Sequence, residues 1–294
     1  SSIIIIKTRI IMFSLEGWEY HELTDMESKK TQILKRQVGV LHLTGLGVGA
    51  VISGDFFGWN YGLDRGGFGG LLLGILFVGA MYICVVLSLA ELASMFPSAE
   101  GAFKFSRVAF GPYGGFICGL AESMEYVLLV PVIITGLGDH LNLLFGLENQ
   151  AFEIIWWTIL LAGYAMLNMR TTLLSFKVTF VVTTVSMLTL VVHWLTCIWS
   201  IKEANQYSEF PSTWNQRVYN IPIEGNNSKF LPKGFGGLIA ALPYAAWFFI
   251  AVEEVPLSGE DAINPIKNIP KALVFSILIL ALCALLTLIS SVSV

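Results

Sequence analysis

Residues 40–61 read VLHLTGLGVGAVISGDFFGWNY, a hydrophobic stretch with ISGD near its middle (52–55). A second hydrophobic stretch, residues 238–257, reads LIAALPYAAWFFIAVEEVPL and carries two adjacent glutamates (253–254). Each is long enough to cross a bilayer as a helix, but glycine and ionisable residues interrupt it partway. Backbone groups that lose helical hydrogen bonds inside a membrane must find partners in a ligand, an ion, water or neighbouring protein. Each interruption therefore predicts a binding site within the membrane.

The composition predicts a membrane protein. Hydrophobic residues make up 55% of the 294 residues, charged residues make up 13%, and the mean hydropathy is +0.72. A soluble domain of this length has no core large enough to bury so much apolar surface. The formal net charge of −4 arises without an acidic or basic block, so we expect a lipid bilayer and no nucleic acid as partner.

Hydrophobic runs of about twenty residues predict seven membrane-spanning helices. We expect them at 40–61, 69–95, 116–145, 152–167, 174–198, 238–257 and 272–294. The apolar residues near the N-terminus (3–13) form too short a run and precede a charged stretch. Residues 1–37 are therefore expected to be a cytoplasmic leader outside the membrane.

Basic residues in the predicted loops orient these helices. They precede the first span and lie between spans two and three, four and five, and six and seven, at positions 29, 30, 35, 36, 104, 107, 170, 177, 267 and 271. All of them fall on one side of the membrane if the N-terminus is cytoplasmic, as the positive-inside tendency predicts. We expect a multi-pass protein of the plasma membrane. The opposite side then carries the loop 202–235 with the sequon at Asn226, which is open to glycosylation only on an extracytoplasmic face.

Two long motifs carry a family resemblance. Residues 90–112 read AELASMFPSAEGAFKFSRVAFGP, and residues 247–270 read WFFIAVEEVPLSGEDAINPIKNIP. In this order and spacing they resemble segments of the amino acid-polyamine-organocation superfamily of transporters, with Glu100 where that family usually has glycine. Residues 51–60 (VISGDFFGWN) and 121–126 (AESMEY) are most similar to its ethanolamine permease branch.

The resemblance implies an all-α integral membrane fold with five-plus-five inverted repeats, in which broken helices one and six hold the substrate and access alternates between the two faces. Residues 38–201 would form the first repeat with helices one to five. After the loop 202–235, residues 236–294 would begin the second repeat with helices six and seven. The chain is then expected to be truncated after the seventh helix.

The resemblance also implies a set of substrate contacts in the two interruptions. They are Ile52, Ser53, Gly54, Asp55, Trp247, Phe249, Ile250, Ala251 and Glu253. A carboxylate such as Asp55 costs roughly 2.5–3.5 kcal/mol near the bilayer centre and needs a partner or water. A substrate ammonium is one such partner, and the fixed charge would repel a substrate carboxylate, which favours ethanolamine over ordinary amino acids. The alternative is that Asp55 pairs within the protein or faces an outer vestibule.

Four residues are candidates for coupling transport to an ion. The resemblance assigns Glu253 to coupling, and Glu122 and Glu125 lie one turn apart on one helix face, where carboxylates can relay protons. Lys177 lies near the place where related carriers hold sodium, so the resemblance implies that sodium is not required. The alternatives are that Glu122 pairs with a basic residue, that Lys177 extends to the membrane interface, and that Trp247 packs or faces lipid instead of covering the substrate.

Three functions fit these observations. The first is a secondary active transporter, not an enzyme, for a small amine or amino acid, with ethanolamine favoured and protons as a possible second partner. The second is a non-transporting fragment or regulatory half-protein. The third is a seven-helix receptor, which conflicts with a cytoplasmic N-terminus and with interrupted spans. The histidines and cysteines lack metal-ligand spacing and nucleotide-binding motifs do not occur, so we expect no metal and no cofactor; the oligomeric state is not predicted.

Overall fold

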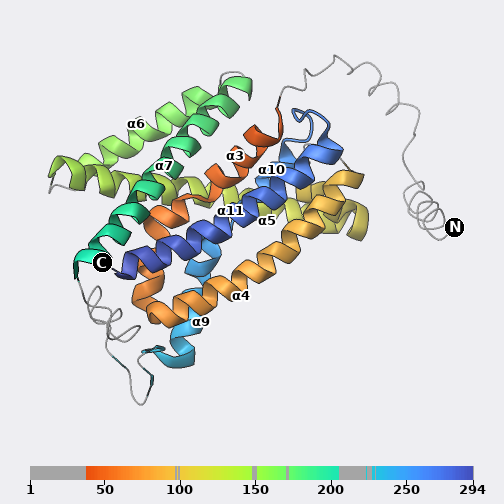
Figure 1. Cartoon of the computed structure of the whole chain (residues 1–294). Helices are drawn as coiled ribbons and strands as arrows, with labels where there is room; N and C mark the ends of the chain where they lie inside the picture. The colour runs from red at the N-terminus through yellow and green to blue at the C-terminus, as the bar shows by residue number, and fades with distance from the viewer. Residues whose placement is uncertain are drawn as a thin grey trace, which may run out of the picture.

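The computed structural model describes residues 38–96, 98, 100–147, 151–169, 172–204, 223, 227, 228 and 230–293. These residues form helices and connecting turns without a β-strand, apart from one isolated bridge between Val38 and Ala262. The helices are α3 (Val40–Val51), η1 (Gly54–Gly58), α4 (Trp59–Met95), α5 (Gly101–Phe145), α6 (Ala151–Asn168), α7 (Thr172–Ala204), α9 (Gly234–Trp247), α10 (Glu254–Leu257) and α11 (Pro265–Ser293) (Figure 1). The predicted leader (1–37) and the sequon asparagine Asn226 lie outside the described residues.

The fold is that of a multi-pass helical membrane protein. Among the described residues, four helices are long and apolar enough to cross a bilayer: Trp59–Met95, Gly101–Phe145, Leu174–Cys197 and Pro265–Ser291. Three shorter apolar helices accompany them: Val40–Val51, Ala151–Leu167 and Gly234–Trp247. Together they cover the seven spans predicted from the sequence. The lipid-facing character is plainest on α5 and α6, whose large apolar side chains are mostly exposed.

Two glycines divide the longest helices into separate segments. Gly67 has φ 69° and Gly111 has φ 75°, a left-handed region that favours glycine. Within α4, the second half of span one therefore ends at Gly67, and span two begins there. Gly111 separates a short first segment of α5 from the long segment that starts at Pro112, in agreement with the predicted beginnings of spans two and three.

The two interrupted spans cross against each other. Span one consists of α3, η1 and the first turns of α4, and span six consists of α9, the turn 248–253 and α10. They approach closely at Gly54, where a β-carbon would come within 2.7 Å of the Trp247 carbonyl oxygen. Helix α11 runs alongside span one and contacts span six at α10 (Figure 1). The interruptions are thus brought together although they are far apart in the sequence.

Span one also packs closely on α7 and α11 through its glycines. A β-carbon at Gly45 would meet the Phe180 ring at 2.7 Å, and one at Gly49 would meet the Thr183 hydroxyl at 2.2 Å. The Thr183 hydroxyl donates a hydrogen bond to the Gly45 carbonyl at 3.1 Å. The glycines of α3 therefore allow close packing against α7.

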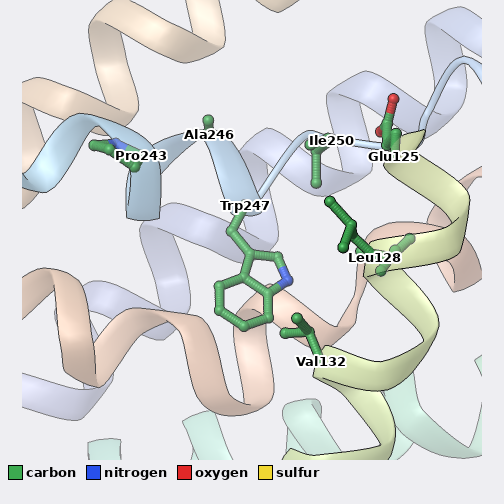
Figure 2. A pocket seen from close by; sticks show the side chains of 8 residues that line it. Glu125, Leu128, Val132, Pro243, Ala246, Trp247 and Ile250 are labelled. Carbon is green, nitrogen blue, oxygen red and sulfur yellow. The ribbon is translucent and has the colours of Figure 1, made fainter. Parts of the chain in front are cut away.

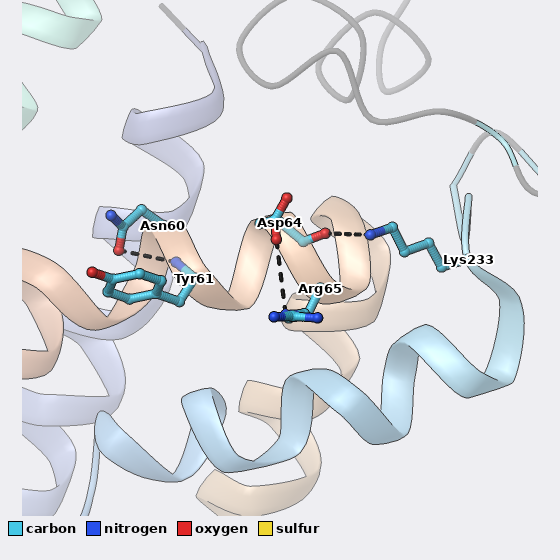
Figure 3. A network of polar contacts seen from close by, with 5 residues as sticks. All are labelled: Asn60, Tyr61, Asp64, Arg65 and Lys233. Carbon is cyan, nitrogen blue, oxygen red and sulfur yellow. Dashed lines mark hydrogen bonds and ion pairs between the residues drawn. The ribbon is translucent and has the colours of Figure 1, made fainter.

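One end of the bundle brings the turn after span one to the beginning of α9. The Lys233 Nζ donates a hydrogen bond to the Asp64 carbonyl at 2.7 Å, and the exposed Asp64 and Arg65 side chains lie 3.8 Å apart (Figure 3). Asp64, Arg65 and the residue that precedes α9 therefore lie at the same end of the bundle.

The opposite end joins the segment before α3 to the loop between α10 and α11. Val38 donates its backbone N–H to the Asp261 carbonyl at 3.1 Å, and Ile263 donates to the Val38 carbonyl at 2.9 Å. The turn between α4 and α5 lies here too, because a β-carbon at Gly259 would meet the backbone of Ser98 at 2.8 Å. Three of the segments predicted to share the basic side therefore meet at one end.

Candidate functional site

The interruption in span six is a buried turn with one strained residue. Phe248 and Phe249 donate backbone hydrogen bonds to Ala245 and Ala246, three residues earlier, at 3.4 and 2.9 Å. Ala251 has φ 74°, a conformation that a β-carbon disfavours. Both phenylalanines and Ala251 are buried, so packing holds the chain in this turn. The predicted interruption of span six is confirmed.

The interruption in span one is milder. The α-helix ends at Val51, and the chain continues through Ile52 and Ser53 into the π-helix η1, with all backbone dihedrals right-handed. A π-helical turn holds an extra residue, which breaks the α-helical bonding pattern without unwinding the chain. The first interruption therefore widens the helix at the position that the sequence predicts.

The Glu253 carboxylate is hydrogen-bonded within the turn that interrupts span six. It accepts hydrogen bonds from the backbone N–H groups of Ala251 and of Glu253 itself, and it also meets the carboxyl group of Glu125 on α5. Backbone N–H groups that lack helical partners in the turn thus donate to a carboxylate of the same segment. Two carboxyl groups in contact can share one proton.

Glu253 belongs to a larger group of acidic and phenolic side chains where α5 crosses the turn. We call this group the acidic cluster; its members interact electrostatically and are Tyr82, Glu122, Glu125, Tyr126, Glu253 and Glu254. In the part of the chain that the structure describes, no basic side chain forms an ion pair with any of them. A cation that enters beside the cluster would favour the ionised form of these acids.

A cavity of about 310 Å³ lies beside the turn, between α9 and α5 (Figure 2). Its walls are apolar except for one carboxylate and are formed by Glu125, Leu128, Leu129, Val132, Pro243, Ala246, Trp247 and Ile250. Figure 2 shows the Trp247 indole extending from α9 toward Leu128 and Val132 on α5. An apolar cavity with one acid and one large aromatic ring fits a small organic cation.

Trp247 connects this cavity to span one. Its indole Nε1 donates a hydrogen bond to the Ser53 hydroxyl at 3.2 Å. Its ring also covers Gly58, where a β-carbon would lie 3.3 Å from the indole. The aromatic wall of the cavity is thereby held against both ends of the π-helix.

Asp55 lies on a different side of η1. Its side chain is 3% exposed and lies beside Cys283 and Thr287 of α11, and the Thr287 hydroxyl is its hydrogen-bond partner. Asp55 is not among the residues that line the cavity beside Trp247. Its role as the ammonium partner stays a prediction, and the geometry of the cavity favours Glu125 for that contact.

Known proteins share this sequence pattern. The profile of the family described as "Amino acid permease" matches residues 42–294. The chain belongs to this family. A transporter of Rhizobium meliloti (strain 1021), named as uncharacterized, is 25% identical over 86% of this chain and 52% of its own length. The branched-chain amino acid permease BcaP of Bacillus subtilis (strain 168) is 28% identical over 84% of this chain and 52% of its own length.

A plant protein is similar to the same extent. Cationic amino acid transporter 7, chloroplastic, of Arabidopsis thaliana is 24% identical over 88% of this chain and 45% of its own length. The chain spans about half the length of the curated relatives that it matches. The family supports the predicted superfamily and a multi-pass membrane protein.

In this member of the family, the remaining predicted site residues lie apart from the cavity beside Trp247. Phe249 is buried and stacks on Tyr82 with 5.8 Å between ring centroids. Ile52 and Ala251 are buried in the packing around the two interruptions. Lys177 is exposed on α7. The structure therefore brings together Ser53, Trp247, Ile250, Glu125, Glu253 and Glu122 at or beside the cavity.

A second cavity of about 270 Å³ opens near Lys177, between α3, α7 and α10. Its lining includes hydroxyl groups and two carboxylates: Leu46, Ser175, Phe176, Thr179, Glu254, Leu257, Ser258 and Asp261. Lys177 does not line this cavity, although its neighbours Ser175, Phe176 and Thr179 do.

Sequence reasoning missed three residues that join the candidate site: Tyr126, Glu254 and Thr287. Tyr126 follows Glu125 and lies one turn after Glu122, so helical spacing alone was a sufficient signal. Glu254 follows Glu253 directly, and the turn places both in the acidic cluster. Thr287 lies in an apolar run with no local signal, because its position beside Asp55 depends on how α11 packs.

Proposed function

We propose that this amino acid permease contributes the substrate site of a secondary carrier that moves a small amine or amino acid across a membrane by alternating access, with ethanolamine as the favoured substrate. The observation that carries the proposal is the acidic cluster without a basic partner, beside an apolar cavity of about 310 Å³. The inverted-repeat arrangement, the plasma membrane and the cytoplasmic N-terminus belong to the same proposal. The meeting of three basic-side segments at one end of the bundle supports that orientation.

The charge distribution favours a cationic substrate. Glu125 supplies the carboxylate of the cavity wall, and Glu253 is in contact with Glu125. The Trp247 ring can attract an ammonium group through its negative face. Both effects would hold an amine at the Glu125 end of the cavity.

Glu253 also favours an amine over an amino acid. Backbone N–H groups at an interrupted membrane helix are where a substrate carboxylate binds in carriers of this architecture. Here the Glu253 carboxylate already accepts hydrogen bonds from the backbone N–H groups of Ala251 and Glu253. A substrate without a carboxylate, such as ethanolamine, avoids competition with this internal acid. The relatives named as amino acid transporters support the amino acid as the second candidate.

Protons are the proposed coupling ions. Glu122, Glu125 and Glu253 lie close enough to interact, and chains of carboxylates in membrane helices mark proton relays. Binding of a cationic amine and release of a proton from the same group would couple the two without any further ion. The residues proposed for this exchange are those in contact with the cavity or one turn from it.

A second candidate function is a binding or regulatory half-protein, favoured by the observation that the chain spans about half the length of its relatives. Binding and transport must therefore be measured separately. In either case the cavity beside Trp247 is the proposed binding site.

The test uses the purified chain in lipid nanodiscs for binding and in proteoliposomes for uptake, with radiolabelled ethanolamine, leucine and arginine. The proposal expects saturable ethanolamine binding that Glu125→Gln weakens by about tenfold or more, since a charged contact is lost. Glu91→Gln on the exposed surface of α4 is the matched control and should bind as the wild type does. Binding without uptake supports the half-protein. Equal affinity for all three compounds in wild type and Glu125→Gln contradicts the proposed site.

A further inference from the structure

The second cavity, between α3, α7 and α10, differs chemically from the cavity beside Trp247. Its volume is about 270 Å³, and its walls combine apolar side chains with residues that carry a hydroxyl or a carboxylate: Ser175, Thr179, Glu254, Ser258 and Asp261. The walls of the cavity beside Trp247 contain a single carboxylate, that of Glu125. A cavity with several converging polar groups can fix the orientation of a small polar ligand.

Three elements bring these polar residues together. Ser175 and Thr179 lie four residues apart on α7 and therefore share one face of that helix. Glu254 begins the short helix α10, and Ser258, which is 6% exposed, caps its other end. Asp261 lies in the loop that leads to α11. Because α3 packs on both α7 and α10, the hydroxyl groups and the acids line one enclosed space.

The two acids of this cavity have no basic partner. In the described part of the chain, no lysine, arginine or histidine lies within ion-pair distance of Glu254 or Asp261. Glu254 interacts electrostatically with two further acids, Glu253 and Glu125. A cation in the second cavity would therefore offset repulsion that the protein's own side chains leave uncompensated.

The buried turn of span six separates the two cavities. Trp247 and Ile250 line the first cavity, whereas Glu254 lines the second, and no residue lines both. Ala251 and Val252, which lie between them in the chain, are fully buried. A ligand in one cavity therefore leaves the other open to a second ligand.

We propose that the second cavity is a separate binding site for a small amine that carries a hydroxyl group, such as ethanolamine. Carboxylates bind an ammonium group through charge-assisted hydrogen bonds. Serine and threonine hydroxyls both donate and accept, so they match the hydroxyl of the ligand. An amino acid would instead bring its carboxylate close to Glu254 and Asp261. The choice of this amine rests on the proposed function, whereas the position of the site does not.

The test counts the radiolabelled ethanolamine molecules bound at equilibrium to the purified chain in nanodiscs. The wild type should bind two molecules per chain at saturation. Asp261→Asn should weaken the second site by about tenfold or more, since a charged contact is lost, and Glu125→Gln should weaken the first. The site that remains in each variant shows that the variant is folded. Glu260→Gln changes an exposed neighbour that does not line the cavity, and it should bind as the wild type does.

A second measurement tests recognition of the hydroxyl group. With Glu125→Gln as the background, Ser258→Ala should lower the affinity of the second site for ethanolamine roughly two- to tenfold, because one hydrogen bond is lost. The affinity for ethylamine, which has no hydroxyl, should stay the same. Equal losses for both amines overturn the proposed hydroxyl contact.

The two proposed sites can fail independently. If Glu125→Gln has no effect while Asp261→Asn weakens binding, the cavity beside Trp247 is not a substrate site and the second site stands. One molecule per chain in the wild type, with binding that Asp261→Asn leaves unchanged, overturns the second site. Two molecules per chain with unchanged affinities in Asp261→Asn overturn it as well.

Discussion

The indole N–H of Trp247 donates a hydrogen bond to the hydroxyl of Ser53 at 3.2 Å, across 194 positions of sequence. The bond joins the interruption of span one to the aromatic wall of the cavity in span six. A relative movement of these two spans must stretch or break it. The pair is therefore placed to report both substrate binding and any change in conformation.

Trp247→Phe tests this bond because it keeps an aromatic ring and removes the N–H donor. A net hydrogen bond contributes about 1 kcal/mol, so ethanolamine affinity should fall by roughly two- to tenfold. Ser53→Ala should have a similar effect, and the double variant should be no weaker than either single variant. Radioligand binding measures all three. Additive losses in the double variant would show that the two residues act separately.

Glu253→Gln tests the proposed coupling through pH. In the wild type, ethanolamine affinity should rise with pH as the acidic cluster loses protons, because an ionised cluster attracts a cation more strongly. Glu253→Gln removes one titrating group, so the profile between about pH 5 and 8 should flatten while part of the affinity remains. Glu91→Gln, on the exposed surface of α4, serves as the control. A profile identical to that of the wild type would remove Glu253 from the coupling role.

Gly54→Ala tests the contact between the two interrupted spans. The added β-carbon would lie 2.7 Å from the Trp247 carbonyl oxygen, and a backbone atom cannot move aside cheaply. We expect a loss of about 1–3 kcal/mol in stability, the usual cost of overpacking. Thermal unfolding in detergent measures it. Gly163→Ala on α6, where a β-carbon meets nothing within 4 Å, should be neutral or slightly stabilising; equal melting temperatures for both variants would refute the close approach.

The positions of the helices were predictable because long apolar runs in a membrane have few alternatives to a helix. The interruption at Glu253 was predictable as well, since adjacent carboxylates and Pro256 oppose a continuous apolar helix. The close packing of α3 follows from its glycines, because small residues in a membrane helix allow close approach. The family resemblance predicted that the two interruptions lie together at one site.

The direction of Asp55 was not predictable. A single extra residue in a π-helical turn rotates every following side chain around the helix axis, so the sequence does not define which neighbour Asp55 faces. The choice between α- and π-helix in η1 depends on contacts with Trp247 and α11, which are distant in sequence. Thr287 became a site residue for the same reason, through the packing of α11 and not through any local motif.

Ala251→Gly tests whether the turn in span six stores backbone strain. Ala251 has φ 74°, and an L-residue in this region costs about 1–2 kcal/mol that glycine does not incur. We therefore expect Ala251→Gly to raise the melting temperature, an unusual outcome for a substitution at a fully buried site. Ala245→Gly is the matched control: it is equally buried but lies inside α9, where glycine costs about 1 kcal/mol relative to alanine. If both variants lower the melting temperature by the same amount, Ala251 does not adopt the left-handed conformation in the folded protein.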